Sequence, residues 1–137
     1  MCLTISKSAT RHILGRMKSS NKIICYKVLT NSNFAIYKYM KYKGGWNYSN
    51  RTSIEMTYDE ERFGEIIYGI HVYTSKKKAM FTKNDFSYLS PEFTTIRKIV
   101  PVICYKKDFV SAGIAHDAVF TKIFVPKKNL TFKKNKV

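Results

Sequence analysis

KIICYKVLT, residues 22–30, is the stretch that decides the fold. It is a compact run of apolar and β-branched residues, which is typical of a central strand in a sheet. Four more stretches have the composition of strands, namely FAIYKYMKY (34–42), EIIYGIHVY (65–73), TIRKIVPVICY (95–105) and AVFTKIFVP (118–126). Because Pro101 has no N–H for the ladder, we expect the strand that contains it to bulge there or to lie at an edge.

Helical patterns are weaker than strand patterns. Residues 75–81 can form a short helix with Ser75 as its N-cap, and the basic stretch 9–18 is a second candidate. These elements predict an α+β fold: a single compact domain over residues 1–126, with a mostly antiparallel sheet of about five strands and one or two short helices. Residues 127–137 are expected to form a basic, flexible tail.

Length and composition exclude several classes of protein. The chain has 137 residues, of which 45% are hydrophobic, so it can bury one core. No run approaches the about 18 apolar residues of a membrane span, and the first residues lack the apolar stretch of a secretory signal. Three cysteines, Cys2, Cys25 and Cys104, fit no metal spacing, and their odd number argues against a disulfide framework. We therefore expect a reducing, cytoplasmic location, with no metal and no cofactor.

Positive charge is the strongest feature of the composition. The formal net charge is +16, from 25 Lys and Arg against nine acidic residues. Residues 1–54 hold ten of the cations and no acid, residues 55–117 hold nine of each sign, and residues 118–137 hold six cations and no acid. A polyanion would relieve this self-repulsion, and nucleic acid, RNA in preference to DNA, is the expected partner. An acidic protein surface would satisfy the charge as well, and a lysine-rich composition alone can also produce a basic surface.

The stretch YGIHVYTSKKKA (68–79) contains a candidate anion site. If a helix begins after Ser75, three lysines lie where the helix dipole disfavours cations, and a bound phosphate would turn them and the first amides into a clamp. His71, on the outward face of the preceding strand, would be available for hydrogen bonding there. The alternative is a strand that runs into a solvated turn, with a half-exposed structural histidine. The candidate residues are Lys76, Lys77, Lys78, His71 and Tyr73.

The stretch YKGGWNYSNR (42–51) is predicted to be a loop, with a double glycine beside the only tryptophan. Aromatic and guanidinium planes stack on bases, at about 1–3 kcal/mol per base. The same residue types anchor protein interfaces, and a loop tryptophan can also fold onto the core. Lysines before the loop and in the tail would add phosphate contacts. The candidate residues are Trp46, Tyr48, Arg51, Lys38, Lys41, Lys43, Lys127, Lys128, Lys133 and Lys134.

No sequence motif indicates catalysis. The chain has no Walker loop, no dinucleotide glycine fingerprint and no kinase signature. His12 and His116 have no partners at triad or zinc spacing, and the acidic run 55–65 is typical of a solvated turn. We therefore expect a binding protein rather than an enzyme.

Four short motifs, MCLTI (1–5), YKV (26–28), GIHVYTSKKKA (69–79) and KIFVPKK (122–128), resemble a family of small phage and prophage accessory proteins. Those proteins begin with a Cys-Leu-Thr stretch and carry a Tyr-Lys-Val strand and a Gly-(Phe/Ile)-His strand before a short helix. The resemblance implies a viral accessory gene, of the kind that often encodes inhibitors of host defence such as anti-CRISPR proteins. It carries over no catalytic residue.

GIHVY (69–73) also resembles, more distantly, ADP-ribosyltransferases, in which a histidine-bearing strand and a later tyrosine-rich strand hold the nicotinamide cofactor. No later strand with a catalytic glutamate is evident. The leading hypothesis is a non-enzymatic phage-type protein that binds nucleic acid, or that covers a nucleic-acid-binding surface of a host defence complex. The alternative is a small nucleotide-handling enzyme or cyclic-nucleotide sponge, with a phosphate at Lys76–Lys78.

Overall fold

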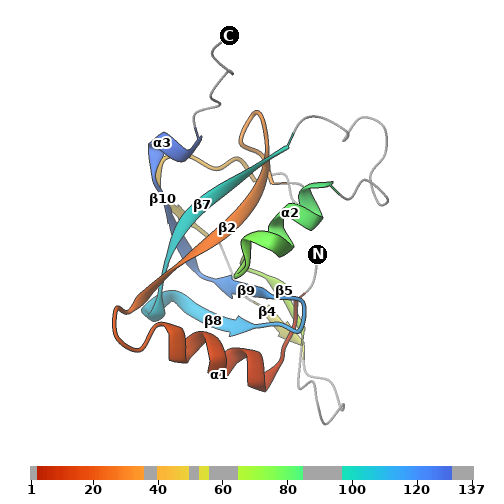
Figure 1. Ribbon diagram of the computed structural model, residues 1–137, viewed down its shortest axis with the longest axis vertical. Coiled ribbons are helices and arrows are strands. Elements are labelled where there is room, and N and C mark those ends of the chain that lie inside the picture. Colours follow the sequence, from red (N-terminus) through yellow and green to blue (C-terminus); the bar gives the residue numbers. More distant parts are fainter. Residues whose placement is uncertain (1–2, 36–39, 50–52, 56–64, 85–96, 131–137) are drawn as a thin grey trace.

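A computed structural model of the protein describes residues 3–35, 40–49, 53–55, 65–84 and 97–130 (Figure 1). Within these residues the fold is α+β and every strand pair is antiparallel, which confirms the predicted class. The predicted number of about five strands was too low. A seven-stranded sheet has the order β3-β10-β7-β2-β6-β9-β8, and a three-stranded sheet has the order β1-β5-β4.

The elements have the following bounds. The strands of the main sheet are β2 (Lys22–Thr30), β3 (Gly45–Tyr48), β6 (Ile70–Tyr73), β7 (Arg97–Tyr105), β8 (Phe109–Ala112), β9 (Asp117–Phe120) and β10 (Lys122–Val125). Those of the small sheet are β1 (Leu3–Thr4), β4 (Ser53–Glu55) and β5 (Glu65–Tyr68). The helices are α1 (Lys7–Arg16), α2 (Lys76–Asn84) and α3 (Lys127–Leu130), and a 3₁₀ turn covers Lys106–Asp108.

The two longest strands, β2 and β7, form the centre of the main sheet. β2 has the predicted bounds, and its pairing with β7 runs unbroken from Lys22 opposite Tyr105 to Thr30 opposite Arg97. The prediction of a bulge or an edge at Pro101 was therefore wrong for this pair. On the other side of β7, β10 pairs with it at Ile103. Near Pro101, the side chain of Asn129 in α3 donates a hydrogen bond to the Pro101 carbonyl. That side of β7 therefore needs no N–H from the proline.

Two predicted strands each divide into two. The stretch 65–73 breaks at Gly69, whose φ of 135° suits glycine far better than other residues, so β5 belongs to the small sheet and β6 to the main sheet. The stretch 118–126 breaks at Thr121, whose backbone N–H donates to the Asp108 carbonyl (2.9 Å). As a result β9 pairs with β6 and β8, whereas β10 pairs with β3 and β7.

The stretch 34–42 does not form the single strand that its alternation predicted. Phe34 bridges Lys41, and the Ala35 N–H donates to the Met40 carbonyl (2.9 Å). The two ends of the stretch therefore pair with each other, which one extended strand cannot do. Residues 36–39 between them lie outside the described residues.

Helix starts follow the capping residues in the sequence. α1 begins after Ser6, whose Oγ accepts from the Ala9 N–H (3.2 Å), close to the predicted helix over 9–18. α2 begins after Ser75, as predicted, and Ser75 Oγ accepts from the Lys78 N–H (3.4 Å). α3 lies in the predicted tail and contacts β7. Among the described residues, no helix has the length and apolar character needed to cross a membrane.

The main core lies on the inner face of the curved sheet. Cys25, Val102 and Cys104 of the central strands, with Phe120 and Ile123 of the next strands, are fully buried there. α1 lies along β8 and seals one end, whereas α2 packs on the opposite, outer side of β2, β6 and β7 (Figure 1). The outer face of β2 is thus covered by α2 toward its C-terminal end only, and the N-terminal part stays open.

Candidate functional site

Four neighbouring strands present one continuous row of apolar side chains on the outer face of the sheet. Strand pairing places Trp46 of β3 opposite Phe124 of β10, Phe124 opposite Ile103 of β7, and Ile103 opposite Ile24 of β2. Residues that face each other across an antiparallel pair point to the same side. Ile24 is 54% exposed although it lies on a central strand. We call these four residues the apolar row.

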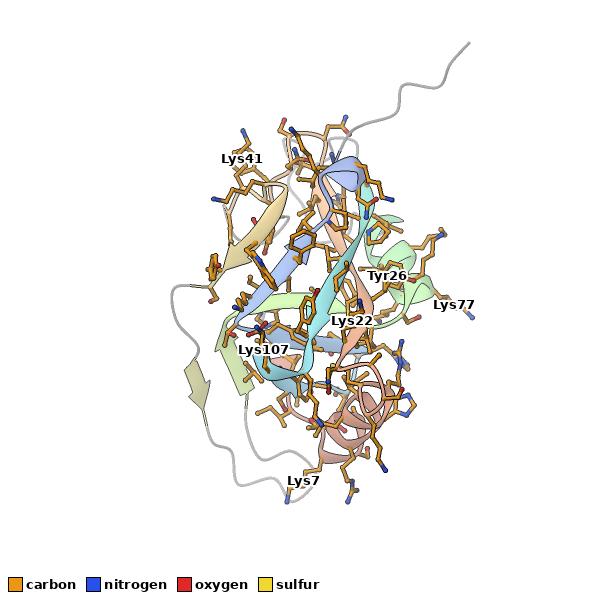
Figure 2. All side chains as sticks on the ribbon, turned by 90° about the vertical axis from the view of Figure 1, so that its left-hand side faces the viewer. Lys7, Lys22, Tyr26, Lys41, Lys77 and Lys107 are labelled. Carbon is orange, nitrogen blue, oxygen red and sulfur yellow. The ribbon has the colours of Figure 1, made fainter. Side chains whose placement is uncertain are left out.

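A second row lies beside the first, two residues further along each strand. It contains Tyr48 opposite Lys122, and Tyr105 opposite Lys22, and we call it the mixed row. Figure 2 shows this side of the molecule, with Lys22 near the centre of the view. The two rows together form a surface that we call the aromatic face, made of Lys22, Ile24, Trp46, Tyr48, Ile103, Tyr105, Lys122 and Phe124.

Rings of the aromatic face contact one another, and the Lys122 ammonium lies over two of them. The Trp46 ring centroid is 5.4 Å from that of Tyr105 and 5.4 Å from that of Phe124, in tilted and edge-to-face geometry. Lys122 Nζ lies 4.7 Å from the Trp46 centroid and 5.8 Å from the Tyr48 centroid. Tyr48 is 58% exposed. A flat group that binds here finds several ring surfaces and a positive charge together.

Asn47 fixes the start of β3, the strand that carries Trp46, and two glycines permit the tight turn that leads into it. Buried Asn47 accepts from the Lys43 N–H (3.0 Å) and donates to the carbonyls of Lys43 (2.8 Å) and Gly45 (3.2 Å). Gly45 has φ 96°, and a Cβ on Gly44 would lie 2.8 Å from Lys127 Cβ. The predicted loop is therefore an edge strand over residues 45–48, because its two glycines permit a tight entry into β3.

The three lysines predicted to form a phosphate clamp at the start of α2 differ in their exposure. Lys76 and Lys77 are exposed, whereas Lys78 is half-buried, and its Nζ lies 5.3 Å from the Phe81 ring centroid. Burial raises the pKa of the Asp117 carboxyl above its ordinary value, and the charge of Lys78 is a smaller, opposing effect. The third lysine therefore lies beside a ring. A phosphate clamp at this helix stays a prediction.

His71 and Tyr73 lie away from the aromatic face. Tyr73 is buried against Val28 and Ala79, beneath α2. His71 lies opposite Val119 of β9, with its Nδ1 3.3 Å from the Gly69 carbonyl, and its own carbonyl accepts from Lys27 Nζ (2.6 Å). Tyr73 is thus a packing residue, and His71 is half-buried within the sheet.

The remaining predicted cations fall into two groups. Lys41, Lys43, Lys127 and Lys128 are exposed, and Lys41 Nζ lies 5.9 Å from the Phe34 ring centroid. The other predicted residues lie outside the described residues: Lys38, Arg51, Lys133 and Lys134.

Positive charge dominates the surface that the structure describes. Of the nine acidic residues, only Asp108 and Asp117 have described side chains, and these are 7% and 5% exposed. Exposed Lys106 and Lys107 follow Tyr105 directly and border the aromatic face, whereas Lys77 of α2 lies further away, beyond Tyr26 (Figure 2). In these parts of the chain the surface field is therefore positive, as an anionic partner requires.

Burial raises the pKa of two groups in the core, the Tyr42 hydroxyl and the Cys104 thiol. Burial raises the pKa of the Tyr42 hydroxyl far above its usual range. Burial and the adjacent Cys25 thiol raise the pKa of Cys104, which disfavours the reactive thiolate. Among the described residues, no three His, Cys, Asp or Glu side chains gather as a metal site.

Sequence reasoning found Trp46 and Tyr48 but missed the partners that complete the face. Tyr105 and Phe124 lie in strongly apolar strands, where either side of the strand can face the core. The alternation of Lys122 and Phe124 with buried Ile123 and Val125 was the available signal. Its meaning depends on the break at Thr121, which the sequence pattern does not mark.

Comparisons with protein-family models, with curated protein sequences and with solved structures found no match for this chain.

Proposed function

We propose that the protein binds single-stranded nucleic acid on the aromatic face and acts by occupancy rather than by catalysis. The observation that carries the proposal is the contact of Trp46 with Tyr105 and Phe124 under the Lys122 ammonium. Bases stack on such rings at about 1–3 kcal/mol each, whatever their sequence, and lysines neutralise the phosphates between them.

Single strands suit this face better than duplexes do. In a duplex the flat surfaces of the bases are stacked on one another, so rings on a sheet surface cannot reach them, whereas a single strand can expose them. The chemistry of the face therefore supports a ligand with free planar bases and a charged backbone.

The described carboxylates and thiols are not placed for catalysis on the aromatic face. Asp108 and Asp117 are buried, as are the thiols of Cys25 and Cys104. None of these groups belongs to the aromatic face, and general acid–base chemistry needs a titratable group within hydrogen-bond reach of the substrate. A ligand on this face would meet rings, aliphatic side chains and lysines.

Fluorescence anisotropy with labelled oligonucleotides tests the proposal. We expect single-stranded RNA or DNA to bind more tightly than a duplex of the same length and composition. The affinity should fall with salt, with a slope of log K against log salt of about −0.7 per phosphate contacted. A preference for the duplex, or a slope near zero, would contradict the proposal and leave a protein partner as the better interpretation of the same face.

A further inference from the structure

The apolar row and the mixed row differ in chemistry. The apolar row carries two rings and two isoleucines across β3, β10, β7 and β2. The mixed row alternates tyrosine and lysine over the same four strands, in the order Tyr48, Lys122, Tyr105 and Lys22. Single-stranded nucleic acid has the same division, because its planar bases lie on one side and its charged sugar–phosphate backbone lies on the other.

The spacing of the rows matches a short run of nucleotides. Neighbouring strands lie about 4.8 Å apart, so four strands span about 14 Å and the two lysines of the mixed row are about 10 Å apart. A span of about 14 Å accommodates about three nucleotides of an extended single strand. The lysines are then placed to contact separate phosphates.

The direction along the two short strands of the face, β3 and β10, offers less. β3 and β10 have four residues each, and in each strand alternate residues face inward: Asn47 in β3, Ile123 and Val125 in β10. A ligand that followed either strand would meet two outward side chains of that strand. A ligand that crosses the sheet meets one outward side chain from each of four strands in each row.

Building on the proposed function, we infer that the bound nucleic acid crosses the four strands, with its bases on the apolar row and its backbone over the mixed row, and that this site takes about three nucleotides. The end at β3 carries the rings of Trp46 and Tyr48 and binds the first base most strongly. The end at β2, formed by Lys22 and Ile24, is reached only by a longer ligand.

A length series tests the inference. Oligouridines from about two to about eight nucleotides long are titrated by competition against a labelled longer strand. Affinity should rise steeply up to about three or four nucleotides and then gain only the slow increase of a general positive field. A steady rise over the whole series, with no change of slope, would overturn the inference.

Two matched double variants test the direction. The first, Lys22→Ala with Ile24→Ala, removes the β2 end, and we expect it to weaken long ligands about tenfold and dinucleotides less than about twofold. The second, Lys41→Ala with Phe34→Ala, removes an exposed lysine and its neighbouring ring from a site outside the face, nearer the top of the view in Figure 2. It should change the affinity for either ligand by less than about twofold.

The outcomes separate the inference from the proposed function. If single strands bind but the two double variants lose affinity equally, or the β2 variant loses it equally at every length, the direction is wrong and the function stands. If single strands show no preference over duplexes, the proposed function itself fails. Circular dichroism of both variants, with unchanged spectra expected, shows that the sheet is intact in each case.

Discussion

The aromatic face and the surface of α2 contain the same local arrangement in different surroundings. On the face, Tyr48 is 58% exposed with Lys122 Nζ 5.8 Å from its ring centroid; on α2, Phe81 is 66% exposed with Lys78 Nζ 5.3 Å from its centroid. The difference is in their neighbours. Tyr48 belongs to a surface to which four strands contribute, whereas Phe81 belongs to a single helix.

The comparison teaches that a ring beside a lysine does not define a binding surface. Sequence reasoning placed its strongest anion site at the lysines that open α2, because local charge is visible along the chain. The aromatic face is assembled by strand pairing between residues as far apart as 22 and 124, so no local window contains it. Matched variants in the two regions test whether this assembly decides binding.

The largest expected effect separates the two exposed rings. Tyr48→Ala should weaken single-strand binding by about 5- to 150-fold, since one stacked base is worth about 1–3 kcal/mol. Phe81→Ala is the matched control, with similar exposure and a similar lysine contact, and we expect it to change affinity by less than about twofold. The measurement is anisotropy at fixed salt. Equal losses in both variants would place the ligand elsewhere.

A second test compares the lysines of the two regions. Lys22→Ala with Lys122→Ala should reduce affinity about tenfold and flatten the slope of log K against log salt by about 1.4, the value for two phosphate contacts. Lys76→Ala with Lys77→Ala removes the same charge from the start of α2 and should change the slope by less than about 0.7. A larger change in the α2 pair would instead favour the phosphate clamp predicted from the sequence.

The sequence predicted the parts of the fold whose signals are local. β2 and the start of α2 could be located because a compact β-branched run and a capping serine act within a few residues. β3 was missed because Gly44 and Gly45, just before and at its first position, are typical of a loop. The outward positions of Ile24, Tyr105 and Phe124 were not predictable, since an apolar residue on an apolar strand does not reveal which side of the sheet will be left uncovered.

Backbone geometry at the edge of the face gives a third test. Gly45→Ala places a side chain at φ 96° and should lower the free energy of unfolding by about 1 kcal/mol or more, with a loss of binding as β3 shifts. Gly15→Ala in α1 is the control, because its Cβ would meet nothing within 4 Å. That change should raise stability by about 0.5–1 kcal/mol. Urea unfolding measures both, and a stabilising Gly45→Ala would contradict the description of β3.

The smallest expected effect is a pH dependence of stability that arises from the buried Asp117 of β9. The pKa of the Asp117 carboxyl is raised by burial, so the folded state holds its proton more tightly than the unfolded state. This group therefore lowers the free energy of unfolding as pH rises from about 4, the unfolded value, through the folded-state pKa. Asp117→Asn should flatten this dependence in thermal melts while leaving single-strand affinity unchanged. An unchanged pH profile would show that the carboxyl titrates normally.

The resemblance to small phage proteins and the inhibitor role that it implies stay predictions, as does the nucleotide-handling alternative at Lys76–Lys78. The nucleotide-handling role would leave a distinct mark on the α2 variants. A nucleotide site there would make Lys76→Ala with Lys77→Ala weaken mononucleotide binding, which calorimetry with a free nucleotide measures directly.

The emission of Trp46, the only tryptophan in the chain, reports most directly on whether nucleic acid binds the aromatic face. Titration with unlabelled oligouridine should quench this emission by base stacking, and the quenching should saturate at the same ligand concentration as the anisotropy signal. Binding that is detected by anisotropy while the Trp46 emission stays constant would contradict the account, because the ligand would then lie on another surface.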